Sequence, residues 1–168
     1  MSDERSWQEL LRNNPLKLSG TEIQEGQKAP DFSVLNNSFE RVRLSDAQGQ
    51  TVIVASVLSV DTPLCDTLIR RLNDMPGRAD TDIWAISMDV PFVQKRWCES
   101  MGVHRVKTFS DFRDRSFAQS YGVLIKEGPL AGLAARAVFV ITKERNVAYA
   151  WYPKEIFDEP DYNRLLIG

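Results

Sequence analysis

Two cysteines are the residues of this chain best suited to chemistry, and Cys65 has the more suggestive setting. It lies in "SVDTPLCDTLIRRLNDM", where a run of strand-forming residues gives way to a helical pattern. Thr62 is placed as the N-cap of that helix, with Pro63 at the first helical position and Cys65 at the third. The free N–H groups and dipole of a helix start favour a reactive thiolate. The alternative interpretation is a small buried hydrophobic residue.

The second cysteine, Cys98, follows 33 residues later, midway through another helical pattern. Its neighbours Trp97 and Met101 also fit a simple apolar helix face, and the spacing excludes a C-x-x-C motif. A disulfide needs Cα atoms about 4.4–6.8 Å apart, a distance that cysteines on helices rarely meet. We therefore expect that a bond between Cys98 and Cys65 requires local unfolding of the second helix. Two distant cysteines and one histidine, His104, do not fit a zinc site, and we expect His104 in a surface loop.

A third candidate is Arg136, in "EGPLAGLAARAVFVI". It stands after a loop of small residues, at the entrance of an apolar strand. Small residues let a ligand or another backbone come close, and the guanidinium fork suits an anion. The alternative is a solvated charge at a strand end. The acidic residues form no convincing catalytic pair, and we expect most of them on solvated faces.

Length and composition indicate one ordinary domain of 168 residues, 43% hydrophobic and 26% charged. The net charge of -2 gives no electrostatic reason to expect nucleic acid or an anionic membrane as a partner. No apolar stretch approaches the roughly 18 residues of a membrane span. The start, "MSDERSWQELLRNN", lacks the apolar core of a signal peptide. We therefore expect a cytoplasmic protein, in which a permanent structural disulfide is uncommon.

The order of patterns predicts an α/β sandwich with a mixed sheet. Alternation around Ser19–Gly20 predicts a small hairpin, and the tail 159–168 predicts a short helix. Between them we expect a strand and turn at 41–50, buried strands at 51–60 and 81–89, helices at roughly 63–75, 91–102 and 111–123, and two strands within 137–152 joined at 143–146. Right-handed crossovers would place the carboxyl ends of the parallel strands near Cys65.

Four segments together resemble the bacterial thiol peroxidases, an atypical two-cysteine branch of the peroxiredoxins. They are "SVDTPLC", "DVPFVQKRWCESMGV", "YGVLIKEGPLAGLAARAVFVI" and "EPDY". The resemblance runs from about residue 13 to the C-terminus, which predicts a single domain at 13–168 after an extension at 1–12. It implies a thioredoxin-like α/β sandwich, with a mixed central sheet flanked by helices and an added N-terminal β-hairpin.

The resemblance also assigns roles to residues. It implies Cys65 as peroxidatic cysteine, Thr62 as active-site threonine, Cys98 as resolving cysteine and Arg136 as active-site arginine. The implied activity reduces hydrogen peroxide and organic hydroperoxides through a Cys65 sulfenic acid and an intramolecular Cys65–Cys98 disulfide, recycled by thioredoxin. The resemblance further implies a homodimer and an activity that needs no metal, flavin or haem.

One position departs from the family pattern. Leu58 stands where the family usually has proline, three residues before Asp61. Leucine keeps the apolar bulk but not the ring, and it restores a backbone N–H. This position favours one alternative, a redox-sensing or binding protein of the same fold with weakened peroxidase activity. A general thiol–disulfide oxidoreductase is the other alternative, disfavoured because C-x-x-C is absent.

Overall fold

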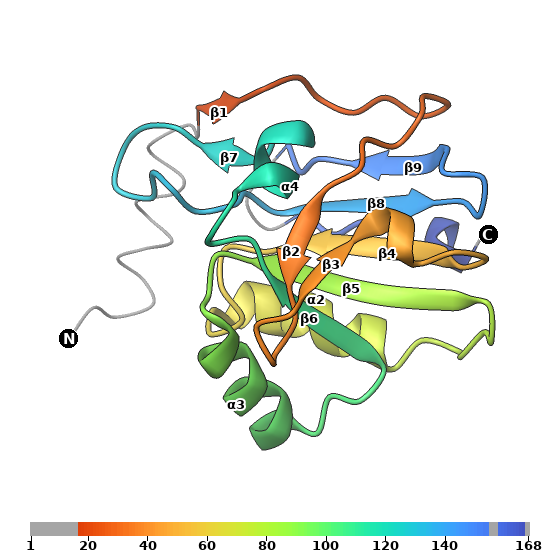
Figure 1. Ribbon diagram of the computed structural model, residues 1–168, viewed down its shortest axis with the longest axis horizontal. Coiled ribbons are helices and arrows are strands. Elements are labelled where there is room, and N and C mark those ends of the chain that lie inside the picture. The colour runs from red at the N-terminus through yellow and green to blue at the C-terminus, as the bar shows by residue number, and fades with distance from the viewer. Residues whose placement is uncertain (1–16, 155–157, 167–168) are drawn as a thin grey trace.

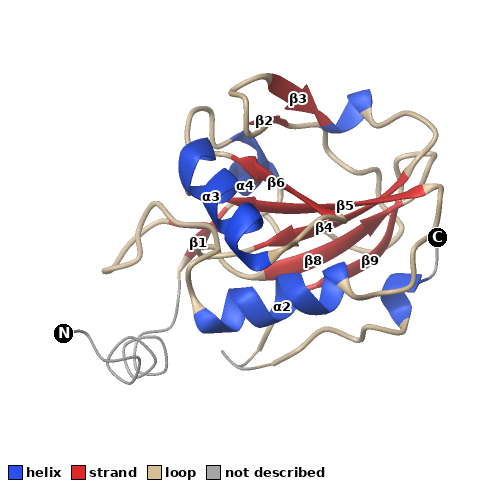
Figure 2. Ribbon diagram, turned by 90° about the horizontal axis from the view of Figure 1, so that it is seen from below, coloured by secondary structure: helices blue, strands red, loops and turns tan. Residues whose placement is uncertain are grey.

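A mixed β-sheet with helices on both faces forms the body of the protein (Figures 1 and 2). The computed structural model describes residues 17–154 and 158–166. The predicted extension at 1–12 lies outside these residues. Seven strands follow the order β3-β2-β6-β5-β4-β8-β9, in which β4, β5 and β6 are parallel neighbours. The predicted α/β architecture with a mixed sheet is confirmed.

The strands of this sheet are short, and the central ones are buried. Their bounds are β2 Ser33–Leu35, β3 Arg41–Arg43, β4 Thr51–Ser56, β5 Thr81–Ser87, β6 Val106–Ser110, β8 Ala137–Ile141 and β9 Val147–Trp151. Every residue of β4 and of β8 is buried. Continuous branched and apolar runs such as these are typical of strands covered on both faces. The two strands predicted within 137–152 are therefore confirmed as β8 and β9.

Among the described residues, three α-helices cover the sheet: α2 (Pro63–Asn73), α3 (Pro91–Met101) and α4 (Ser116–Ser120). The crossovers from β4 to β5 to β6 are of the same hand, so α2 and α3 lie on one face. The short α4 lies on the other face (Figure 1). Short 3₁₀ turns occupy Leu44–Asp46 and Arg164–Leu166, the second within the predicted C-terminal helix.

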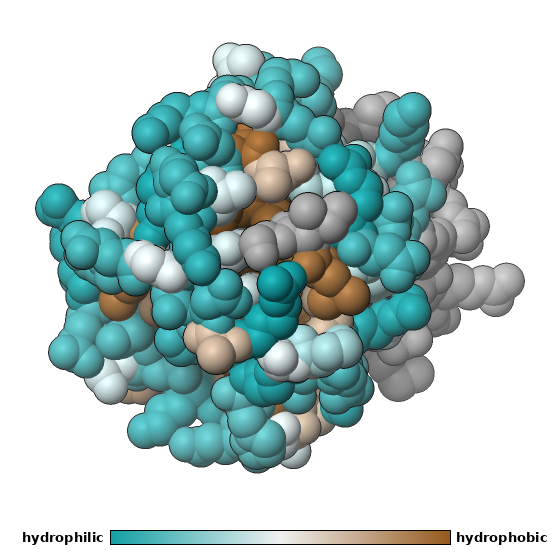
Figure 3. All heavy atoms as spheres, turned by 90° about the vertical axis from the view of Figure 1, so that its right-hand side faces the viewer, coloured by the Kyte–Doolittle hydropathy of each residue, from teal (hydrophilic) through white to brown (hydrophobic). Residues whose placement is uncertain are grey.

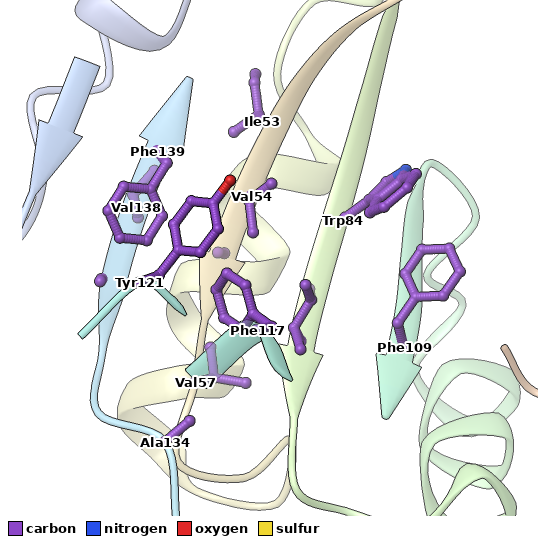
Figure 4. Packing of buried hydrophobic residues seen from close by; sticks show 14 of the residues in the cluster. Ile53, Val54, Val57, Trp84, Phe109, Phe117, Tyr121, Ala134, Val138 and Phe139 are labelled. Carbon is purple, nitrogen blue, oxygen red and sulfur yellow. The ribbon is translucent and has the colours of Figure 1, made fainter. Parts of the chain in front are cut away.

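Aromatic side chains fill the space between α4 and the sheet (Figure 4). The ring of Tyr121 lies 5.1 Å from that of Phe139 on β8 and 4.9 Å from that of Phe117 on α4. Its hydroxyl donates a 2.7 Å hydrogen bond to the carbonyl of Pro30. These contacts hold Tyr121 and α4 against β8 and the segment at Pro30.

The predicted bounds of the first two helices are nearly right, and those of the third are wrong. Helix α3 begins at Pro91 and ends before Gly102, which takes the left-handed conformation at φ 64°. The predicted helix at 111–123 is reduced to α4. Arg115 has φ 56°, which stops a helix from continuing through it. The carboxylate of Asp111 instead receives the N–H groups of the first helical turn, so the preceding residues form a turn.

The predicted hairpin around Ser19–Gly20 is wrong. Strand β1 (Leu18–Ser19) pairs antiparallel with β7 (Leu124–Ile125), which lies far away along the chain. A Cβ added to Gly20 would lie 2.7 Å from the carbonyl oxygen of Gln119, so only glycine fits this crossing. In the region that the structure describes, the first hairpin is β2–β3, with Val34 opposite Val42. The alternating pattern indicates a partly buried strand at Leu18–Ser19, but it does not reveal which strand pairs with it.

The carboxylate of Asp111, which caps α4, makes the free energy of unfolding depend on pH. Asp111 is buried, and its carboxylate accepts the N–H groups of Phe117 and Ala118 at 3.3 and 2.9 Å. Burial raises the pKa of Asp111 from 3.8 to about 6. Between these two values the folded protein binds more protons at this carboxyl than the unfolded chain does, so the free energy of unfolding falls as pH rises.

We expect this loss to be on the order of 2 kcal/mol between pH about 4 and about 7, and to disappear in Asp111→Asn, which cannot titrate. Urea unfolding of both proteins across this range measures it. The comparison is between the two slopes with pH, because the substitution also changes the stability at every pH. Equal slopes would show that Asp111 does not titrate in this window.

The surface differs between parts of the molecule. The side that faces right in Figure 1 is mostly hydrophilic (Figure 3). Among the described residues, the exposed large hydrophobic side chains are Val90, Phe92, Val93, Met101 and Leu166. Four of these five belong to α3 and its N-cap. None of the helices that the structure describes is long and apolar enough to cross a membrane.

Candidate active site

Cys65 lies in the first turn of α2, as the sequence predicts. Thr62 is the N-cap, with extended backbone angles of -107° and 140°, and Pro63 occupies the first helical position. The first helical bond runs from Asp66 N to Thr62 O at 2.8 Å, so the N–H groups of Leu64 and Cys65 have no acceptor within the helix. The Cys65 side chain is 0% exposed. It is therefore both a buried residue and a helix-start thiol.

The hydroxyl of Thr62 bonds to the loop before α2 rather than to the helix itself. It makes no capping bond to the helix and instead donates to the carbonyl oxygen of Ser59 at 3.1 Å. Because its proton is committed to Ser59, the lone pairs of this oxygen remain able to accept a hydrogen bond.

Arg136 lies at the same end of the sheet as the start of α2. It directly precedes β8, where Ala137 pairs with Ser56, the last residue of β4. The Ser56 hydroxyl donates to the carbonyl of Ala135 at 2.7 Å and ties the two segments together. Arg136 is only 4% exposed, so the interpretation as a solvated strand-end charge is wrong.

The C-terminal segment orients the guanidinium of Arg136. Nη1 donates to the carbonyl of Asp158 at 3.0 Å, and Nη2 lies 3.9 Å from Oε1 of Glu159. The guanidinium also lies 5.5 Å from the centre of the Trp151 ring. Glu159 accepts a 2.6 Å hydrogen bond from the hydroxyl of Tyr162, whose pKa burial raises above its ordinary value. Glu159 and Tyr162 are the first and last residues of the motif "EPDY", so part of this motif holds the arginine.

Cys98 is half-buried in the last two turns of α3. Its Sγ lies 3.5 Å from the hydroxyl of Thr108 on β6, which in turn donates to Oδ1 of Asn37 at 3.1 Å. Burial raises the pKa of the Cys98 thiol, Glu99 adds to the rise, and the contact with Thr108 opposes it. A thiol of this kind is protonated near neutral pH. It also forms part of the wall of a cavity of about 570 Å³ between β6 and the β2–β3 hairpin.

The two cysteine sulfurs are not bonded to each other. Both cysteines are free thiols. Cys65 is at the beginning of α2, beside the carboxyl end of β4, whereas Cys98 comes seven residues after Pro91 and so lies about 10 Å along α3 from its start. A Cys65–Cys98 bond requires Cys98 to leave its contact with Thr108, and the local unfolding of α3 expected from the sequence stays a prediction.

Asp89 also belongs to the hydrogen-bond network around this site, although the sequence alone suggested only a solvated acid at this position. Its carboxylate accepts hydrogen bonds from the hydroxyls of Ser59 and Ser87 at 2.8 and 2.6 Å, and from Val60 N at 2.9 Å. One signal in the sequence could have found it. Asp89 is the second residue after the buried parallel strand β5 and precedes the proline-led helix α3, and ligand sites gather at such strand ends.

Two other positions singled out in the sequence have simple settings. Leu58 is 6% exposed and packs in the core cluster that also contains Cys65. Its side chain thus fills apolar space in the loop where the family usually has proline. His104 is exposed, as expected, and its backbone N–H donates to Asn73 Oδ1 at 3.1 Å.

Comparisons with known proteins match nearly the whole chain. Residues 25–150 match the AhpC/TSA family. The chain is 41% identical to the thiol peroxidase of Bacillus subtilis (strain 168) over 155 residues, which cover 92% of this chain and 91% of the relative. It is also 41% identical to the thiol peroxidase of Aquifex aeolicus (strain VF5) over 157 residues, or 93% and 92% of the two chains. The crystal structure of a peroxiredoxin-like protein from Aquifex aeolicus is 42% identical, with a TM-score of 0.82, and the match covers 89% of this chain and 88% of that one.

Proposed function

The chain belongs to the AhpC/TSA family and is a thiol-dependent peroxidase, and within that activity we propose that Cys65 attacks the hydroperoxide and Cys98 resolves the product. The observation that carries this assignment is the position of Cys65 in the first turn of α2, at the sheet end where the buried Arg136 also lies. Thr62, the N-cap of the same helix, completes the proposed site.

The first step is an attack of the Cys65 thiolate on one oxygen of the hydroperoxide. A sulfur–oxygen bond forms while the O–O bond breaks, and its electron pair leaves with the second oxygen, which takes a proton to become an alcohol or water. Cys65 is oxidised by two electrons to a sulfenic acid. Because Cys65 is wholly buried, the peroxide reaches it only when neighbouring residues move.

Negative charge moves from sulfur to the leaving oxygen during this step. The N–H groups of Leu64 and Cys65 and the guanidinium of Arg136 are the donors proposed to stabilise it, and Thr62 accepts from the hydroperoxide O–H. Donors fixed in advance in a buried site lower the barrier more than the same groups do in water. The contacts of Arg136 with Asp158, Glu159 and Trp151 provide that fixed orientation.

In the second step Cys98 attacks the sulfenic acid of Cys65. A disulfide forms and water leaves, so no further electrons are exchanged with an outside molecule. Cys98 must first leave Thr108, and α3 must rearrange around it. A dithiol reductant then regenerates both thiols by exchange, and we propose thioredoxin for this role.

We further propose that the working protein is a homodimer. Val90, Phe92 and Val93 expose apolar surface at the start of α3, with Phe92 72% exposed. Exposed apolar patches of this kind on a soluble protein mark interaction sites. We propose that a second copy of the chain covers this surface. Sedimentation equilibrium of the parent and of Phe92→Glu measures the monomer–dimer equilibrium.

The remaining proposals concern organisation and location. Residues 13–168 are proposed to form a single domain after the extension at 1–12, and the family match at 25–150 lies inside these bounds. A cytoplasmic location is proposed because the catalytic cycle needs a supply of reducing dithiol and both cysteines as free thiols.

Intact mass spectrometry tests the two cysteine roles. With one equivalent of cumene hydroperoxide, we expect the reduced parent to lose two hydrogens as the disulfide forms, and Cys98→Ser to gain one oxygen that dimedone traps as a sulfenic acid. If the reduced parent keeps both thiols for minutes after the addition, the proposed mechanism fails.

A further inference from the structure

A single carboxylate joins the loop before Cys65 to the end of β5. Asp89 Oδ1 accepts from the Ser59 hydroxyl at 2.8 Å, while Oδ2 accepts from Val60 N at 2.9 Å and from the Ser87 hydroxyl at 2.6 Å. Ser59 and Val60 belong to the loop between β4 and α2, whereas Ser87 is the last residue of β5. The loop is thus held to the neighbouring strand through Asp89.

The same network continues from Ser59 into the candidate site. The carbonyl of Ser59 receives both the hydroxyl of Thr62 at 3.1 Å and its N–H at 3.4 Å. The position of Ser59 therefore fixes the N-cap of α2, three residues before Cys65. A displacement of this carbonyl would move the threonine and the first turn of the helix together.

On its other side the network reaches the helix that carries Cys98. The amide of Gln94, buried in the first turns of α3, donates to the Ser87 hydroxyl at 3.0 Å and to the carbonyl of Phe109 at 2.7 Å. The start of α3 is therefore fixed to β5 and β6. Asp89 lies in the sequence and in space between this anchored start and the loop that leads to Cys65.

We propose that Asp89 is a positioning residue for the peroxidase reaction, because it fixes Ser59 and thereby the Thr62 cap and the first turn of α2 that holds Cys65. This inference rests on the proposed role of Cys65. Asp89 itself touches no reacting atom. Its effect arises because a small misplacement of a reacting group or of its hydrogen-bond partners lowers the rate strongly.

The test compares the second-order rate constant for Cys65 oxidation among variants, by quenched flow with a mass readout. Asparagine keeps the shape of the Asp89 side chain but has one acceptor oxygen fewer. We expect Asp89→Asn to oxidise at Cys65 about 10-fold more slowly than the parent, and Asp89→Ala to oxidise more slowly still. The matched control is Asp82→Asn, at the other end of β5, where a partly exposed carboxylate pairs with the exposed Lys107 at 3.2 Å. That variant should stay within about twofold of the parent, since such pairs contribute little.

A double-mutant cycle with Ser59→Ala separates positioning from a general loss of stability. Ser59→Ala alone is expected to slow the oxidation about threefold, and Ser59→Ala combined with Asp89→Ala should be no slower than Asp89→Ala alone, because both changes break the hydrogen bond between Ser59 and Asp89. Rates are taken well below the thermal midpoint of each variant. Additive effects, or an Asp89→Asn protein as fast as the parent or faster, would overturn the inference. If the parent itself does not oxidise at Cys65, the proposed function fails instead.

Discussion

Peroxide turnover disappears when Cys65 is replaced by serine: we expect a loss of at least about 10⁴-fold, to the background rate without enzyme. A serine hydroxyl stays protonated near neutral pH and forms no sulfenic acid, so neither the first step nor the disulfide can occur. The position at the start of α2 does not compensate, because the N–H groups stabilise charge that serine does not carry. Hydroperoxide consumption with an excess of dithiol reductant measures the loss.

The control for this variant is Cys98→Ser, which makes the same replacement in the other cysteine. It should still consume one equivalent of hydroperoxide, whereas Cys65→Ser should consume none. Serine at the buried position 65 places a hydroxyl among apolar neighbours at a cost of about 1–3 kcal/mol, so circular dichroism and thermal unfolding must show a folded variant. Turnover that survives in a folded Cys65→Ser protein would assign the attack to another group.

Features set by local chemistry were predictable from the sequence. The cap at Thr62, the proline at the first helical position and the thiol at the third all depend on residues within four positions of one another. The bounds of α3 follow from Pro91 and Gly102 in the same way. Such features can be predicted because they depend on the backbone geometry and capping bonds of a few neighbouring residues, and not on tertiary contacts.

Features set by distant partners were not predictable from the sequence. The pairing of Leu18–Ser19 with Leu124–Ile125 depends on where α4 and its turn place β7, and no local pattern records that. Helix α4 is short because Arg115 takes a left-handed conformation and Asp111 caps from outside the helix. In both cases tertiary contacts override the local propensity.

The candidate site falls between these two cases. The local pattern left Cys65 and Arg136 undecided between functional and simple interpretations, and the resemblance to a family assigned their roles. The structure shows Arg136 buried and held by Glu159, which no spacing rule predicts. Asp89 escaped notice because its three partners come from two separate segments of the chain.

Arg136→Lys should lower the second-order rate constant for Cys65 oxidation by about 100-fold, since lysine keeps the charge but loses the planar fork that gives several donors fixed directions. The buried guanidinium is held by the carbonyl of Asp158 and by Glu159, so it is ready before the peroxide arrives. An ammonium group on a flexible stem lacks these constraints. The measurement is the same quenched-flow oxidation, followed at several peroxide concentrations.

Two further variants decide whether the orientation or only the charge of Arg136 matters. Glu159→Gln leaves the guanidinium in place but removes the carboxylate charge 3.9 Å from it, and we expect the rate constant for Cys65 oxidation to fall about threefold to tenfold.

The matched control for Arg136→Lys is Arg164→Lys, because Arg164 also pairs with a carboxylate, Glu25 at 3.1 Å, and also lies over an aromatic ring, that of Tyr149. Its rate should stay within about twofold of the parent. If Arg136→Lys oxidises as fast as this control, a positive charge suffices at the site, and the fixed fork of Arg136 has no part in the stabilisation of the leaving oxygen.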